Sequence, residues 1–157
     1  MPNKVIDEIP PDYLQAIGKV VVSWNQLDIG VNLLLIFFLG KDIKHNRSHI
    51  VFAHMAFPQK LDVMGALVED LIKQPGNKYL EAYKLTVLPL LKQAQGARNS
   101  VVHAMWGAKS GKVRKAFMSA RGTFKFSWTV ADLKEIQIAS QQIESAYQSL
   151  ISLLNQK

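Results

Sequence analysis

The chain has 157 residues, the size of one domain, and its 48% hydrophobic and 20% charged residues are typical of a globular protein with a real core. It contains no cysteine, so disulfides, thiolate metal sites and a cysteine nucleophile are excluded. The formal net charge of +7 indicates anionic partners, nucleic acid first among them.

The N-terminal part predicts a polar tail followed by a long helix. Residues 1–9 form a loose tail without the apolar core of a signal peptide. After Pro10 and Pro11, apolar residues recur at alternating spacings of four and three as far as Leu39, which predicts one helix with an apolar seam. Its longest apolar run, Val31 to Leu39, is shorter than the roughly 20 residues that a spanning helix needs. We therefore expect a cytoplasmic protein that does not associate with a membrane.

The middle of the chain predicts three more helices. A short one runs from Ser48 to Met55, and the next begins near Pro58 and ends near Ile72. After the turn at residues 74–77, a second long helix spans Lys78 to Met105. Pro89 lies inside this helix and should kink it or split it in two, because proline lacks the backbone N–H that the helix needs.

The hydrophobic period changes after Gly107, and this change predicts a β-hairpin over residues 108–128. Aromatic and polar residues alternate from Thr123 to Trp128, which is strand spacing, and residues 113–119 can pair with them across a turn at Arg121-Gly122. Residues 129–132 resemble a capping box, and a last helix follows to about Leu154. The expected fold class is therefore all-α. It is a single domain over residues 1–157, an up-and-down bundle of four or five helices with a small β-hairpin before the last one.

Positive charge is concentrated in one acid-free stretch between Glu81 and Asp132, which holds nine cations. Such a field attracts polyanions, although a solvated basic surface is the alternative. The cations of the predicted hairpin are candidate RNA-binding residues: Lys109, Lys112, Arg114, Lys115, Arg121 and Lys125. Aromatic residues interleaved with these cations can stack on bases. The alternative, that they form a buried sheet face, is the one that the alternation favours.

The residues that indicate chemistry are Arg98, Asn99 and His103, near the end of the second long helix. Asn99 and His103 are one turn apart and share a helix face, and the long Arg98 side chain can reach the same cleft. A guanidinium suits bidentate binding of phosphate, and an imidazole can move a proton near neutral pH. No metal and no other cofactor is needed for such a site.

The segment Arg98-Asn99-Ser100-Val101-Val102-His103 resembles the motif of the HEPN family, an arginine and a polar residue followed by a histidine. The segment Trp24-Asn25-Gln26-Leu27-Asp28 resembles the part of the first helix that often bears an acidic residue near the site, which makes Asp28 a candidate supporting residue. The resemblance implies a metal-independent endoribonuclease that leaves 2′,3′-cyclic phosphate and 5′-hydroxyl ends. His103 would be the general base or acid, Arg98 would hold the phosphate, and Asn99 would orient the phosphate or the imidazole. The resemblance also implies a homodimer with both motifs at a shared cleft, and a role in a toxin–antitoxin pair or in phage defence.

Two other functions fit the same residues. One is a catalytically inactive HEPN-like module that binds RNA or a partner protein, such as an antitoxin or a regulatory protein. The other is a purely structural helical dimer, in which Arg98 pairs with Asp28 to join the two long helices and His103 caps a carbonyl at the helix end. In that case Asp28 would be structural, and helical spacing alone does not fix its orientation.

Overall fold

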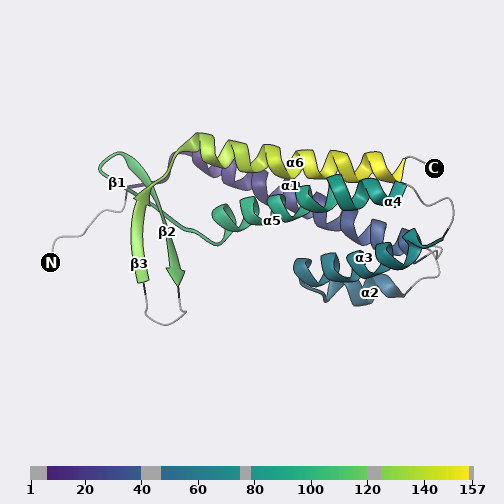
Figure 1. The fold of residues 1–157 in the computed structure, drawn as a ribbon. Coiled ribbons are helices and arrows are strands. Elements are labelled where there is room, and N and C mark those ends of the chain that lie inside the picture. The colour runs from purple at the N-terminus through teal and green to yellow at the C-terminus, as the bar shows by residue number, and fades with distance from the viewer. Residues whose placement is uncertain (1–6, 40–46, 75–78, 120–124, 156–157) are drawn as a thin grey trace.

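The computed structural model describes residues 7–39, 47–74, 79–119 and 125–155. Two long helices, α1 (Pro11–Phe38) and α6 (Leu133–Leu154), lie side by side, and α5 (Leu88–Val102) packs against both (Figure 1). The shorter helices α2 (Ser48–Ala53) and α3 (Phe57–Ile72) lie against α1 on another side (Figure 1). The sheet stands at the end of the helical body where α1 and α6 begin (Figure 1).

The core is formed by the apolar seams of these helices. Gly30 allows α1 and α6 to approach closely, because a side chain there would meet Leu150 at 3.2 Å and the Tyr147 ring at 3.4 Å. The helices contribute these fully enclosed large side chains: Val20, Leu27, Val31, Leu34, Leu35, Met64, Leu80, Tyr83, Leu91, Ile136, Ile143 and Leu150. Burial of the apolar seams against one another accounts for the helical part of the fold.

The second long helix is interrupted before Pro89. The chain forms α4 (Tyr79–Ala82), a π-helical turn η1 (Tyr83–Val87) and then α5, with Pro89 in the first turn of α5. Proline has no N–H to offer the carbonyl four residues earlier. The wider π turn shifts the backbone hydrogen bonds by one residue, so that the Leu88 N–H donates to the Tyr83 carbonyl, five residues back. The expected effect of Pro89 on the helix thus takes the form of a π turn.

The prediction of an all-α bundle carrying only a β-hairpin was wrong. Between α5 and α6 the chain forms a three-stranded antiparallel sheet with the order β1 (Met105–Lys109), β2 (Lys112–Ser119) and β3 (Lys125–Val130). The helix expected to reach Met105 ends at Val102, and Met105 is already the first residue of a strand. A tight turn at Ser110-Gly111, where φ is positive at both residues, joins β1 to β2. The strand β1 has only five residues, so its alternation was too short to be recognised in the sequence.

The two ends of the sheet segment also differ from expectation. Asp7, placed in the loose tail, forms a β-bridge with Ala108, and its carboxylate accepts from the Gly111 N–H at 3.4 Å. Thr129 lies within β3, so it does not cap α6. The N-cap of α6 is Asp132, whose side chain accepts from the Lys134 N–H at 2.9 Å.

Within the described part of the chain, α1 is the one helix that is long and apolar enough to cross a membrane. The sequence expectation rested on the run from Val31 to Leu39 alone, and so it underestimated the apolar length of the whole helix. In its most apolar 18-residue stretch, 44% is buried within the protein. The length and composition of such a helix do not distinguish a membrane span from a core helix of a soluble protein. Its exposed apolar side chains include Leu14, Val22, Ile29 and Leu33.

Candidate functional site

One open pocket of about 350 Å³ is lined by all three candidate catalytic residues, Arg98, Asn99 and His103. It lies where the end of α2, the first turn of α3 and the last turns of α5 meet the middle of α1. Its lining consists of Trp24, Asp28, Ala53, Met55, Ala56, Phe57, Pro58, Lys60, Gln95, Arg98, Asn99 and His103. The pocket therefore combines an apolar wall with two cations, one carboxylate and one imidazole.

Arg98, Asn99 and His103 are brought together at the C-terminal end of α5. One guanidinium nitrogen of Arg98, Nη1, lies 3.1 Å from the Asn99 Oδ1 and 2.6 Å from the His103 Nε2. His103 is the C-cap of the helix and its side chain is exposed, whereas Arg98 is half-buried. Because the helix ends here, the imidazole can fold back over the last turn toward the guanidinium.

The contact between Arg98 and His103 fixes the proton arrangement of the imidazole. A guanidinium has only N–H donors and no acceptor, so Nε2 of His103 must be the acceptor. The imidazole is then neutral and carries its proton on Nδ1. In this state Nε2 holds a lone pair beside a permanent cation.

Arg98 is held by an aromatic wall and not by a carboxylate. Its guanidinium carbon lies 5.5 Å from the centre of the Trp24 ring, which itself packs against Phe57 at 4.4 Å between ring centroids. No carboxylate of a described residue lies within 4.0 Å of the guanidinium, and the buried Nε has no hydrogen-bond partner there. Such a cation retains capacity for an anionic ligand.

Asp28 lies in the same pocket, but it does not contact Arg98 or His103. Both of its carboxylate oxygens accept from the Lys60 ammonium, at 2.7 and 2.9 Å. The Lys60 side chain is only 3% exposed and that of Asp28 is 34% exposed. The pairing of Arg98 with Asp28 that a purely structural role required is therefore not formed, and Lys60 takes the place of Arg98.

Lys60 was missed by the sequence reasoning, although a signal for it was present. In α3 the buried positions are Phe57, Lys60, Leu61, Met64 and Val68, which follow the spacing of three and four of one helix face. A lysine within such a stripe requires a counter-charge on the neighbouring helix. Asp28 provides this charge from α1.

The predicted RNA-binding cations do not share one surface. Antiparallel partners point to the same side of a sheet, and the pairs Gly107–Arg114 and Lys109–Lys112 place Lys109, Lys112 and Arg114 on one face. Lys115 points to the other face, where it pairs with Glu135 of α6. Arg121 and the side chain of Lys125 lie outside the described residues. Three of the six cations thus form a continuous basic face.

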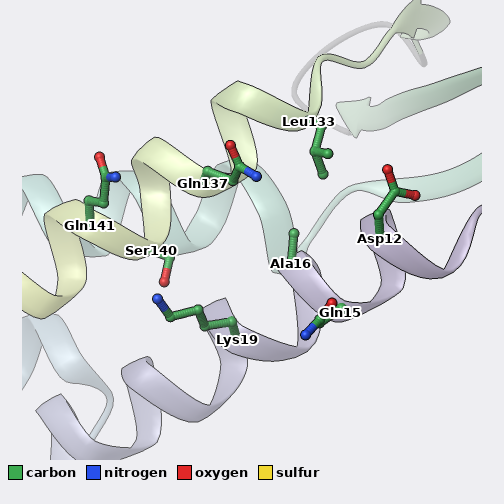
Figure 2. A pocket seen from close by; sticks show the side chains of 8 residues that line it. All are labelled: Asp12, Gln15, Ala16, Lys19, Leu133, Gln137, Ser140 and Gln141. Carbon is green, nitrogen blue, oxygen red and sulfur yellow. The ribbon is translucent and has the colours of Figure 1, made fainter.

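A second hollow, of about 370 Å³, lies between the first turns of α1 and α6 and shares no residue with the first (Figure 2). Amide, hydroxyl and charged side chains line it, including Gln137, Ser140 and Lys19 (Figure 2). Lys19 forms an ion pair with Glu144 at 3.0 Å, and the Ser140 hydroxyl is buried with no partner among the described groups. Among the described residues that line this hollow there is no histidine, the side chain whose ordinary pKa lies near neutral pH.

Comparisons with known proteins returned no match, whether to protein-family models, to curated proteins or to solved structures. Among the residues that the structure describes, no group of three histidine, aspartate or glutamate side chains gathers to hold a metal ion.

Proposed function

We propose that the protein is a metal-independent endoribonuclease of the HEPN type, cleaving RNA to 2′,3′-cyclic phosphate and 5′-hydroxyl ends. The observation that carries the proposal is the contact of 2.6 Å between the Arg98 guanidinium and the His103 imidazole at an open pocket. A cation without a carboxylate partner among the described residues binds the scissile phosphate, and the adjacent imidazole moves the proton.

The reaction is a transesterification within the RNA strand. The 2′-hydroxyl oxygen attacks the neighbouring phosphorus, the bond from phosphorus to the 5′-oxygen breaks, and the 5′-oxygen takes up a proton as it leaves. His103 accepts the proton of the 2′-hydroxyl or donates one to the 5′-oxygen. Arg98 offsets the charge that develops on the phosphate oxygens in the transition state.

The contacts within the site suggest an order of events. In the free protein, Nε2 of His103 accepts from Arg98 and so is not available as a base. An incoming phosphate is a stronger acceptor for the guanidinium than a neutral imidazole, because it carries charge. Binding therefore draws Arg98 toward the phosphate and releases Nε2. Asn99, whose Oδ1 accepts from Arg98 at 3.1 Å, orients the guanidinium and not the imidazole.

The reaction needs a second proton-transfer group, and among the residues that the structure describes His103 is the one imidazole that lines the pocket. The proposal therefore includes a homodimer in which His103 of the partner subunit supplies that group. Exposed apolar residues on α1 support a dimer face beside the pocket. Val21 is exposed and lies two turns before Asp28, hence on the same side of the helix, and Ile29 and Leu33 are exposed on a neighbouring face. Sedimentation of the purified protein tests the dimer, and a monomer that cleaves RNA would contradict it.

A second candidate function is binding of RNA, or of a partner such as an antitoxin, without cleavage. The same contact of Nε2 with Arg98 favours it, because the imidazole is already engaged in the free protein. Cleavage then would not occur, while the basic pocket would still hold a phosphate. The two functions differ in whether RNA ends appear.

The deciding experiment incubates purified protein with total RNA in the presence of a metal chelator and identifies the new ends chemically. Arg98→Ala and His103→Ala should each slow cleavage by about 10²–10⁴-fold, which is the range for losing a charged donor or a general acid–base group. His54→Ala is the matched control, because His54 is exposed and does not line the pocket. Cleavage by both variants at the wild-type rate would reject the site. RNA retention that weakens with salt, without new ends, would establish the binding module.

The cellular part of the proposal is a cytoplasmic toxin or phage-defence component, by analogy with the family that the motif resembles. Fractionation of cells that make the protein tests the location. Recovery with the membrane, released only by detergent, would assign α1 to the bilayer instead of the core.

A further inference from the structure

The sheet face that carries Lys109, Lys112 and Arg114 has the composition of a surface for unpaired bases. It carries a hollow of about 440 Å³ lined by residues that include Met105, Gly107, Lys109, Arg114 and Trp128. Met105 is 45% exposed and Trp128 is 41% exposed. For Trp128 this exposure differs from the expectation of a buried aromatic sheet face, whereas the side chains of Phe124 and Phe126 lie outside the described residues.

Small residues allow the Trp128 indole to lie across the sheet. Its partner in β2 is Ala116, which is 1% exposed, and its ring reaches β1, where a side chain on Gly107 would meet it at 3.3 Å. A large residue at either position would push the ring away from the sheet. Gly107 of β1 and Ala116 of β2 lie beneath the partly exposed indole, which thus gives a flat aromatic surface beside the hollow.

Positive charge frames this flat surface. Lys109 and Arg114 line the hollow, and Lys112 shares their face by register. The buried Nε of Arg114 has no hydrogen-bond partner among the described residues, and none of their carboxylates lies within 4.0 Å of its guanidinium. The carboxylate of Asp7, whose residue bridges to β1 at Ala108, accepts from the Gly111 N–H at the turn between β1 and β2. An apolar surface can stack on a nucleotide base, and cations at its edge can contact the phosphates on either side of that base.

We propose that this sheet face is a subsite for single-stranded RNA, where one unpaired base enters the hollow against Trp128 and its phosphates contact Arg114 and Lys109. This inference rests on the proposed function, since it extends the binding surface of the same substrate. Bases in a duplex are stacked on each other and cannot offer a face to an indole, so the ligand is an unpaired strand. Met105 follows His103 by two residues, so their Cα atoms are at most about 8 Å apart and one strand can reach both sites.

The test uses a fluorescent 12-nucleotide DNA strand, which has no 2′-hydroxyl and so binds without being cleaved, measured by fluorescence anisotropy. Trp128→Ala should weaken binding by about 5- to 150-fold, the equivalent of one lost base-stacking contact. Phe117→Ala is the matched control, because Phe117 is 44% exposed on the opposite face of the same sheet, and it should change binding less than twofold. Arg114→Gln leaves the indole in place and should both weaken binding and reduce its salt dependence.

Several results would overturn the subsite. The first is that Trp128→Ala and Arg114→Gln both bind the strand with wild-type affinity, and the second is that Trp128→Ala and Phe117→Ala lose the same affinity. The third is that the wild-type protein binds a hairpin duplex of the same composition as tightly as the single strand, and the fourth is that it does not bind the strand. Thermal unfolding of each variant shows whether it is folded. If Trp128→Ala does not fold, the affinity of Arg114→Gln for the strand tests the subsite instead. The DNA strand cannot be cleaved, so its binding does not depend on whether the protein is a nuclease. If the wild-type protein binds the strand but does not cleave RNA, the subsite stands and only the nuclease proposal is rejected.

Discussion

The ion pair between Asp28 and Lys60 should respond asymmetrically to loss of its two partners. The Lys60 side chain is 3% exposed, and its ammonium donates to both oxygens of a carboxylate that is 34% exposed. Asp28→Asn keeps the shape of the side chain but leaves the enclosed ammonium without a counter-charge. Lys60→Met instead leaves a carboxylate that water can reach, with an unbranched apolar chain in the place of the lysine stem.

Removing one partner of a buried ion pair costs about 3–5 kcal/mol. Asp28 is partly exposed, so water screens some of the interaction, and we expect Asp28→Asn to lower the free energy of unfolding by about 3 kcal/mol. For a chain of 157 residues this corresponds to a fall in Tm of about 6–12 °C. Lys60→Met should cost about 1 kcal/mol or less, which is typical of a volume-conserving change.

Urea unfolding of the two single variants and the double variant measures these values as a double-mutant cycle. The double variant should be more stable than Asp28→Asn alone, because it no longer encloses an uncompensated charge. Equal costs for the two single variants, or additive costs in the double variant, would refute the reasoning that Lys60 is enclosed and depends on Asp28.

Four further changes test other parts of the fold. Burial raises the pKa of Tyr83 above its ordinary value of 10.0, so the stability linked to its neutral form is present below pH 10 and is lost as the pH rises above it. Tyr83→Phe should leave the free energy of unfolding at pH 7 unchanged or higher, because the hydroxyl has no partner among the described groups, and should reduce the alkaline loss; an unchanged alkaline loss would contradict the assignment. Gly18→Ala should raise the free energy of unfolding by about 0.4–1 kcal/mol, since nothing lies within 4 Å of an added methyl group on this exposed helix position. Gly30→Leu should lower it by about 1–3 kcal/mol by forcing α1 away from α6, and equal thermal shifts for the two glycine variants would show that the helices are not in close contact. Trp106→Phe should lower it by about 0.5–1.5 kcal/mol in urea unfolding through loss of the 2.9 Å bond from Nε1 to the Val101 carbonyl, and an unchanged value would show that this bond does not hold β1 to α5.

The long helices could be read from the sequence because their apolar residues repeat over many turns. Such a repeat specifies both the element and its buried face. The strand β1 could not be read in this way, because its five residues follow a helix directly and contain Gly107, which is also typical of a helix end. Its pairing with β2 depends on a two-residue turn and on contacts across the sheet, which local pattern does not encode.

For the candidate site, the sequence by itself determined that Arg98, Asn99 and His103 lie within one or two turns of a single helix, because chain connectivity and helical period require it. The tertiary structure decided which groups complete the pocket. It brought Lys60 from α3 to Asp28 of α1. Arg98 therefore contacts Trp24 and His103, and it has no carboxylate partner among the described residues. Contacts between distant segments arise from the packing of whole helices, and one helix's own periodicity states which face is buried but not which residue of another helix will lie against it.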